Sequence, residues 1–253
     1  MQKPFVEPEA GYQFDPESLT VESQHQSEKL LSCGLDPAVF KSYVDISFFI
    51  GLGIHFGIRN GISAEGNVNM LQRLSQSRPV ELGEELVVKG FIREVQAVPR
   101  GRVVDTEVWF EDQQGIKVVD ASRRSLKPDP NRVGTRGAGE RPAPALVAPW
   151  AELEEFTLTP KNVVRYSSEG NSIHYEPEAA KKAGFRAPII GGGMGVHYLM
   201  DALWKESTPQ SVDLDIYFRR PIFWDDKFTV VKNHEALGLI RRDGKVLTEA
   251  KLN

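Results

Sequence analysis

The sequence has a single cysteine, Cys33, among its 253 residues. A lone cysteine cannot form an intrachain disulfide, and no Cys/His cluster has zinc-site spacing, so the stability must come from packed cores and no metal is expected. The longest apolar stretch, residues 46–58, falls well short of the ~20 apolar residues that span a bilayer. The first residues also lack the basic start and apolar run of a secretory signal. We therefore expect a cytoplasmic protein with no membrane partner.

Charge of either sign is not in excess. The chain carries 31 Lys and Arg against 35 Asp and Glu, for a net charge of −4. This balance argues against broad attraction to nucleic acid or to an anionic membrane, so any anionic ligand must be held by a local basic patch. Hydrophobic residues at 40% and charged residues at 26% are typical of a folded globular protein.

A proline- and glycine-rich segment, residues 128–149, lacks apolar periodicity and is typical of a linker. It separates residues 1–127 from residues 150–253, and these halves share a repeat. The segment 51–58 (GLGIHFGI) aligns with 193–200 (GMGVHYLM), and at the same offset the tripeptide Arg-Pro-Val at 78–80 aligns with Arg-Pro-Ile at 220–222. Two separate matches at one offset indicate an internal duplication, packed as a pseudo-dimer.

Each half has the same order of expected elements. A helix at 46–58 or 192–205 is followed by short β-rich runs separated by turn signals. These runs are 68–74, 85–95, 103–111 and 116–126 in the first half, and 212–218, 228–234, 236–240 and 246–252 in the second. A long helix wrapped by a curved antiparallel sheet is the hotdog arrangement. The fold class we predict is therefore α+β, a double hotdog.

Residues 166–189 carry the chemistry. Glu169 and His174 would lie on different faces of a helix, but the residues between them, Gly170 to Ser172, favour a turn that brings carboxylate and imidazole to one side. Such a pair, meeting at one water molecule, can act as acid and base. Farther along the chain, residues 191–193 are three glycines that begin the second helix, where unpaired N–H groups can receive developing negative charge.

This segment resembles the signature of the MaoC-like, or type 2, (R)-specific enoyl-CoA hydratases and 3-hydroxyacyl-thioester dehydratases. That signature reads roughly Gly-Asp-x-Asn-Pro-x-His, then an acidic residue, Ala, Gly-Phe and Pro-Ile. The matching positions are Ser168, Glu169, Asn171, Ser172, His174, Glu176, Ala179 or Ala180, Gly184, Phe185, Pro188 and Ile189. This sequence has glutamate for the family aspartate, serine for proline at Ser172, and Gly191 where histidine is common.

The resemblance implies a hydro-lyase in which Glu169 and His174 are the catalytic dyad and the Gly192 N–H contributes to an oxyanion hole. Asn171 would organise the loop, and Gly191 and Gly193 would bind substrate beside Gly192. The substrate would be a small-molecule acyl thioester of CoA or acyl carrier protein, as in fatty acid metabolism, and neither metal nor redox cofactor is required. In hydration, one member of the dyad removes a proton from water as its oxygen adds to Cβ of the enoyl group, and the other member protonates Cα. Dehydration is the reverse.

The offset of the repeat places serines opposite the dyad, so we expect one active site per chain, with the first half shaping the acyl pocket. A homodimer of the double unit stays open. Lys181 and Arg186 are candidates for contact with CoA phosphates, although a solvated helix face explains them equally well. Arg219 and Arg220 are interpreted as surface charges.

Two other functions remain open. An acyl-CoA thioesterase would need a carboxylate near the central helix, where Asp201 is the only acidic residue well inside. A non-catalytic acyl-thioester binding module would keep the fold without competent chemistry, which the glutamate at position 169 favours. His55 and His197 occupy equivalent places in the two helices, so we interpret both as packing or hydrogen-bonding residues.

Overall fold

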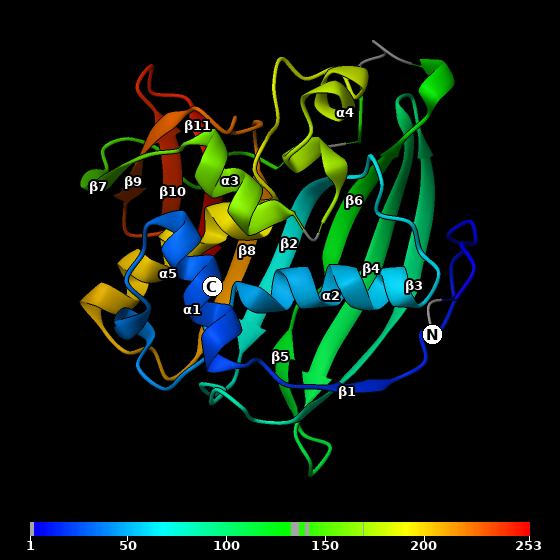
Figure 1. Cartoon of the computed structure of the whole chain (residues 1–253), viewed down its shortest axis with the longest axis horizontal. Coiled ribbons are helices and arrows are strands. Elements are labelled where there is room, and N and C mark those ends of the chain that lie inside the picture. Colours follow the sequence, from blue (N-terminus) through cyan, green and yellow to red (C-terminus); the bar gives the residue numbers. More distant parts are fainter. Residues whose placement is uncertain (1–2, 133–136, 140–141, 169) are drawn as a thin grey trace.

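The structure, a computed structural model, describes residues 3–132, 137–139, 142–168 and 170–253. In the first half, short N-terminal elements precede a buried helix and five strands (Figure 1). In chain order these elements are β1 (Glu17–Leu19), α1 (Ser23–Cys33), the 3-10 turn η1 (Pro37–Phe40), α2 (Phe48–Arg59), β2 (Val68–Gln76), β3 (Leu86–Val98), β4 (Gly101–Glu111), β5 (Lys117–Asp120) and β6 (Arg123–Pro128).

The second half repeats the order of helix and strands after an additional strand and a loop region with short helices. Its elements are β7 (Ala151–Thr157), α3 (Pro160–Ser167), the 3-10 turn η3 (Ser172–His174), α4 (Pro177–Lys182), α5 (Gly192–Glu206), β8 (Val212–Phe218), β9 (Lys227–Lys232), β10 (Ala236–Arg241) and β11 (Val246–Leu252). The 3-10 turn η2 (Pro130–Arg132) lies in the segment between the halves. Strands β8 and β11 have the bounds that the sequence predicts.

Several elements differ from the sequence-based expectation, among them the short strand β1, which was not predicted. The run predicted at 116–126 is interrupted between β5 and β6, where Asp120 Oδ1 accepts the Ser122 N–H at 2.9 Å. Helix α1 was not predicted because polar and charged residues break its apolar periodicity. Strand β7 was not predicted because it is an edge strand with three glutamates and mostly exposed side chains.

All strands belong to one antiparallel sheet, with the order β1-β3-β4-β5-β2-β8-β11-β10-β9-β7 and with β6 paired to β2 and β4. The two halves meet where β2 pairs with β8. In that ladder Arg73 lies opposite Asp215, and these two positions are separated by the offset of the sequence repeat. Equivalent residues therefore face each other across the junction, as a pseudo-two-fold axis between two copies of one fold requires.

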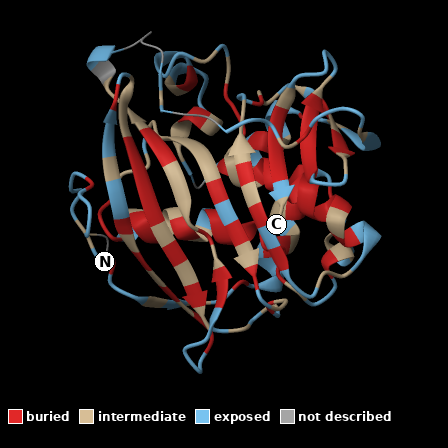
Figure 2. Ribbon diagram, turned by 180° about the vertical axis from the view of Figure 1, so that it is seen from behind, coloured by how far each residue is buried: buried red, intermediate tan, exposed pale blue. Residues whose placement is uncertain are grey.

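Helices α2 and α5 lie against the same face of this sheet (Figure 1). Phe49 and Phe56 of α2 and Met194 and Leu199 of α5 are fully buried in the core between helices and sheet. Seen from behind, the strands alternate between buried and more exposed residues, as expected for a sheet with one covered face (Figure 2). Within the described part of the chain, no helix is both long enough and apolar enough to cross a bilayer.

Candidate active site

A cavity of about 400 Å³ lies between the two halves and reaches the first residues of α5. Its walls come from α2, from the segment between α2 and β2, from β6, from residues 166–174 and 189–195, and from the end of β8. Apolar side chains such as Ile50, Ile54 and Ile190 line much of it. A mainly apolar cleft with a few polar groups is the usual form of a small-molecule site.

The start of α5 is open to this cavity because it consists of glycines. Gly191 has extended backbone and is the residue before the helix, and no side chain caps the first N–H groups. A Cβ on Gly192 would lie 2.7 Å from Cζ of Phe218, which is closer than carbon atoms approach each other. Only glycine therefore lets the helix start pack this closely against the Phe218 ring. The N–H groups of this first turn have no partner within the helix and can bind an anionic oxygen.

His174 lies at the same end of the cavity, held by the loop that the sequence singles out. Asn171 begins η3, since its Oδ1 accepts the Ile173 N–H at 3.2 Å, and its Nδ2 donates to the Ala64 carbonyl at 3.1 Å. This second bond fixes the loop to the first half of the chain. The structure thus has a 3-10 turn at Ser172–His174, directly after Asn171, next to the turn that the sequence predicts at 170–172.

The tautomer of His174 follows from its hydrogen bond. Nδ1 is 2.8 Å from the Ile189 carbonyl oxygen, which can only accept, so Nδ1 carries the proton and Nε2 has the lone pair. Nε2 would lie 3.6 Å from a Cβ on Gly191, so it faces the residue that precedes α5. Burial lowers the pKa of His174, because desolvation penalises the imidazolium, and this outweighs the opposite effect of the Ile189 carbonyl. The imidazole is neutral at pH 7 and can act as a base.

Glu169, the predicted partner of His174, lies outside the described residues. Its neighbours Gly170 and Asn171 line the cavity, and the Gly170 N–H donates to the Ser167 carbonyl at 2.9 Å. The prediction that Glu169 and His174 meet at one water molecule stays a prediction.

A buried hydrogen-bond chain runs from the core to the cavity. His197 of α5 has Nδ1 2.5 Å from Oδ2 of Asp45 and 2.5 Å from Oγ of Ser47, and all three side chains are fully or almost fully buried. The Asp45 carboxylate accepts a hydrogen bond from Nδ1–H of His197. This leaves Nε2 to accept a hydrogen bond from the Tyr166 hydroxyl group at 2.8 Å. The Tyr166 hydroxyl would lie 3.7 Å from a Cβ on Gly193. The chain thus links both halves and ends beside the first turn of α5.

Sequence reasoning assigned hydrogen bonding or packing to His197, and missed Asp45, Ser47 and Tyr166. One signal was available for Asp45, an acidic residue at the border of the longest apolar stretch, where a buried carboxylate needs partners. The other predicted packing histidine, His55, lines the cavity.

The cations are placed differently from the sequence-based expectation. Arg186 pairs with Asp225 and Asp226 and lies over the Phe223 ring, and neither it nor Lys181 lines the cavity. Their contact with CoA phosphates stays a prediction. The interpretation of Arg219 as a surface charge is wrong, because its side chain is 11% exposed, pairs with the buried Glu249 and lines the cavity. Arg100 and Arg220 also line the cavity.

Other candidate groups lie away from the cavity. Asp201, the carboxylate that a thioesterase mechanism would use, is buried in α5, pairs with Lys205 and does not line the cavity. Burial raises the pKa of its carboxyl group, against the effect of Lys205. Among the residues that the structure describes, no three His, Cys, Asp or Glu side chains gather as a metal site would require.

Comparisons with known proteins find similarity in structure. No family model matches the chain, and no curated protein matches its sequence. HtdX from Mycobacterium tuberculosis superposes with a TM-score of 0.74 at 19% identity, over 94% of this chain and 98% of that chain. A MaoC-like dehydratase from Phytophthora capsici gives 0.68 at 18% identity, over 96% of each chain.

A further Mycobacterium tuberculosis protein, described as having a double hotdog fold, superposes with a TM-score of 0.62 at 10% identity, over 96% of this chain and 95% of that one. The chain has a double hotdog fold. This confirms the fold class that the sequence predicts, and the intrachain pseudo-dimer with it. The structural neighbour from Phytophthora capsici is described as a MaoC-like dehydratase, which is the family that residues 166–189 resemble.

Proposed function

We propose that this double hotdog protein is a hydro-lyase that hydrates trans-2-enoyl thioesters, or dehydrates 3-hydroxyacyl thioesters, with (R) specificity. The observation that carries the proposal is the place of His174. Its neutral imidazole presents Nε2 to the glycine start of α5 at the end of an apolar cavity. A base and a set of free N–H donors at one point of a cleft are what addition of water to a conjugated thioester needs.

In this proposal the thioester carbonyl oxygen accepts the Gly192 N–H, and Glu169 and His174 hold a water molecule. One of the pair removes a proton from water as its oxygen bonds to Cβ. The π electrons of the C=C bond then move toward the carbonyl, and the other member of the pair gives a proton to Cα. The N–H donors at the start of α5 stabilise the enolate oxygen that develops in between. Dehydration is the same path in reverse, and the proposal uses no metal or redox cofactor.

The carrier is proposed to be CoA or acyl carrier protein. Arg100 and Arg220 line the cavity and carry the charge that a phosphorylated carrier would need. The proposed partner is a small-molecule thioester. The proposal includes neither nucleic acid nor a membrane as a partner, and it places the protein in the cytoplasm.

The test is to incubate the protein with a short trans-2-enoyl-CoA and to follow both the absorbance of the conjugated thioester and the release of free thiol. We expect the absorbance to fall without thiol release. Thiol release would instead indicate a thioesterase, and binding with neither signal would indicate a non-catalytic module.

Variants of the pair sharpen the test. Glu169→Gln and His174→Gln should each lower the rate of hydration by at least about 100-fold, the low end of what a positioned acid or base contributes. The matched control is His234→Gln, since the His234 side chain is 85% exposed and distant in sequence from the signature. Turnover unchanged by Glu169→Gln would refute the assignment of that carboxylate.

A further inference from the structure

The part of the cavity floor that belongs to the first half is polar. Arg123 and Ser125 of β6 line it, together with Asn67, just before β2, and Asn69 in β2. Ser125 pairs with Asn69 in the β2–β6 ladder, and residues two apart on a strand share a face, so these side chains lie on one patch. The face of an antiparallel sheet that packs against a helix is normally apolar, so a polar patch there needs a reason.

Several atoms of this patch have unmet hydrogen-bonding capacity. Oδ1 of Asn67, Oδ1 of Asn69 and Nε of Arg123 are buried without a hydrogen-bond partner among the described residues. Buried polar atoms in native proteins are normally paired, so unpaired ones beside a cavity indicate a ligand or water. Because an amide can be turned to present either N–H or C=O, Asn69 can donate to a ligand as well. The amide of Asn67 is fixed, since its Nδ2 donates to the Ser63 carbonyl at 3.0 Å.

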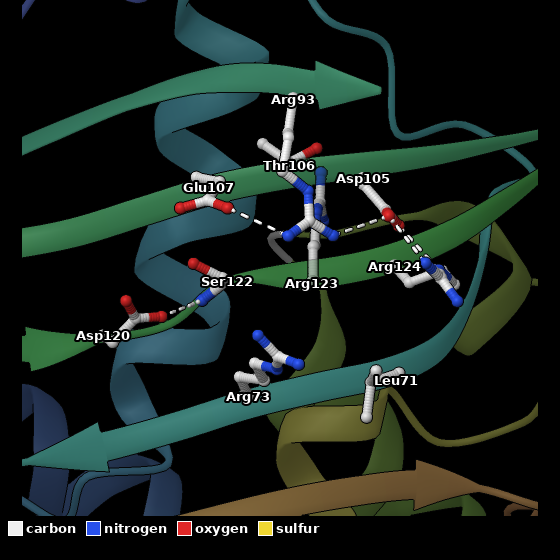
Figure 3. A pocket seen from close by; sticks show the side chains of 10 residues that line it. All are labelled: Leu71, Arg73, Arg93, Asp105, Thr106, Glu107, Asp120, Ser122, Arg123 and Arg124. Carbon is white, nitrogen blue, oxygen red and sulfur yellow. Dashed lines mark hydrogen bonds and ion pairs between the residues drawn. The ribbon is translucent and has the colours of Figure 1, made fainter. Parts of the chain in front are cut away.

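Arg123 is the decisive member of the patch. No acidic side chain in the described part of the chain forms an ion pair with it. Burial lowers its pKa to about 10, so the guanidinium is still charged at pH 7. The next residue, Arg124, points to the opposite face and makes two hydrogen bonds of 2.7 Å to Asp105. Figure 3 draws a second, smaller pocket, which Arg123 and Arg124 both line, and shows dashed lines between Arg124 and Asp105, whereas none reaches Arg123.

Helix α2 runs from the proposed reacting centre to Arg123, so its rise per residue gives the distance between them. Ile50 lies beside the start of α5, since its Cβ would be 3.9 Å from a Cβ on Gly193. Gly57, two turns later, lies beside Arg123, whose Nη2 would be 3.9 Å from a Cβ there. At roughly 1.5 Å per residue these points are about 10 Å apart along the helix. Ile54 and His55 line the cavity between them, so an acyl chain can run along α2 from thioester to guanidinium.

We propose that Arg123, with Ser125 and Asn69, binds a carboxylate at the far end of the acyl chain, so that the substrates are mono-thioesters of dicarboxylic acids. This rests on the proposed function for the thioester end of the cavity. A carboxylate accepts two parallel hydrogen bonds from the N–H groups of a guanidinium, and it supplies the negative counter-charge that Arg123 lacks. A chain that ends in a methyl group would leave the guanidinium desolvated and unpaired, which is costly.

The test measures binding rather than turnover. Isothermal titration compares the saturated thioesters octanedioyl-CoA and octanoyl-CoA, which differ only in the terminal carboxylate and methyl groups, with six- and ten-carbon pairs as a length series. At one or more of the three lengths, we expect the thioester that ends in a carboxylate to bind about 10- to 100-fold more tightly than the one that ends in a methyl group. This is the gain in affinity that hydrogen bonds between charged groups typically give. Arg123→Gln should abolish this preference and leave octanoyl-CoA binding within about threefold.

Arg124→Gln is the matched control and should keep the preference, because Arg124 is bound to Asp105 on the other face. The comparison in the unmodified protein needs no variant, so it stands even where Arg123→Gln does not fold. Equal binding of the two ligand types at all three lengths overturns the carboxylate site and leaves the proposed reaction intact. Binding of neither type overturns the proposed function together with this inference.

Discussion

The contact between Gly192 and Phe218 gives the sharpest prediction about how the fold positions the site. Gly192→Ala would place a Cβ 2.7 Å from Cζ and 2.8 Å from Cε1 of the Phe218 ring. Ordinary carbon contacts lie near 3.5–4.0 Å, so either the ring or the start of α5 must move by about 1 Å. The N–H groups proposed to hold the thioester oxygen move with the helix.

Two magnitudes follow. A displacement of about 1 Å in a reacting group costs ~100-fold in rate, so kcat/KM for hydration should fall by about that factor. Overpacking typically destabilises by about 1–3 kcal/mol, which for a chain of this size lowers Tm by roughly 2–12 °C. We expect the variant to stay folded at 25 °C, so the loss of stability does not lower the concentration of folded enzyme in the assay. The fall in kcat/KM therefore reports the displacement of the site.

The assay combines thermal unfolding and hydration kinetics on four proteins: unmodified, Gly192→Ala, Phe218→Ala, and the double variant. Removing the ring gives the new Cβ space, so the double variant should recover at least about 1 kcal/mol relative to the sum of the single variants. Gly195→Ala is the control in the same helix, since its Cβ would make only ordinary contacts, the nearest at 3.5 Å to Leu239.

Two results would refute this reasoning. Gly192→Ala with unchanged Tm and with kcat/KM within threefold of the unmodified protein would show that the close approach is unimportant. Additive losses in the double variant would show that the ring is not what the new Cβ meets.

Two further predictions concern pH and the buried hydrogen-bond chain. Because His174 must be neutral to act as a base and burial lowers its pKa, kcat/KM should fall on acidification with a midpoint below the ordinary 6.5; a pH–rate profile checks this, and a midpoint above 7 contradicts it. Asp45→Ala removes the acceptor of the buried His197 Nδ1–H, and should cost about 3 kcal/mol and lower Tm by roughly 6–12 °C. Asp215→Ala, which removes the 3.6 Å pair with Arg73, should change Tm by less than about 3 °C; equal losses in the two variants would argue against the buried chain.

The helices and strands of the repeat could be predicted because local patterns specify them. The apolar content of α2 and α5, and the β-rich runs between turn signals, gave the order of elements in both halves, with β8 and β11 at their observed bounds. The constant offset between the two halves predicted the pseudo-dimer, and the pairing of Arg73 with Asp215 repeats that offset in space. The loop that carries His174 was likewise recognisable, since its residues and spacing match a known signature.

What the sequence alone determined about this protein was therefore its repeat, most of the helices and strands of that repeat, and the loop that holds His174. These features are encoded by local patterns in the chain. The tertiary structure decided which distant side chains meet. Asp45 and His197 are 152 residues apart, and no sequence periodicity indicates that they form a hydrogen bond in the core. Arg123 and Arg124 are adjacent and alike in sequence, but the alternation of a strand sends one to the cavity and the other to Asp105. Burial and pairing depend on packing between elements, and so become visible only once the two halves are brought together.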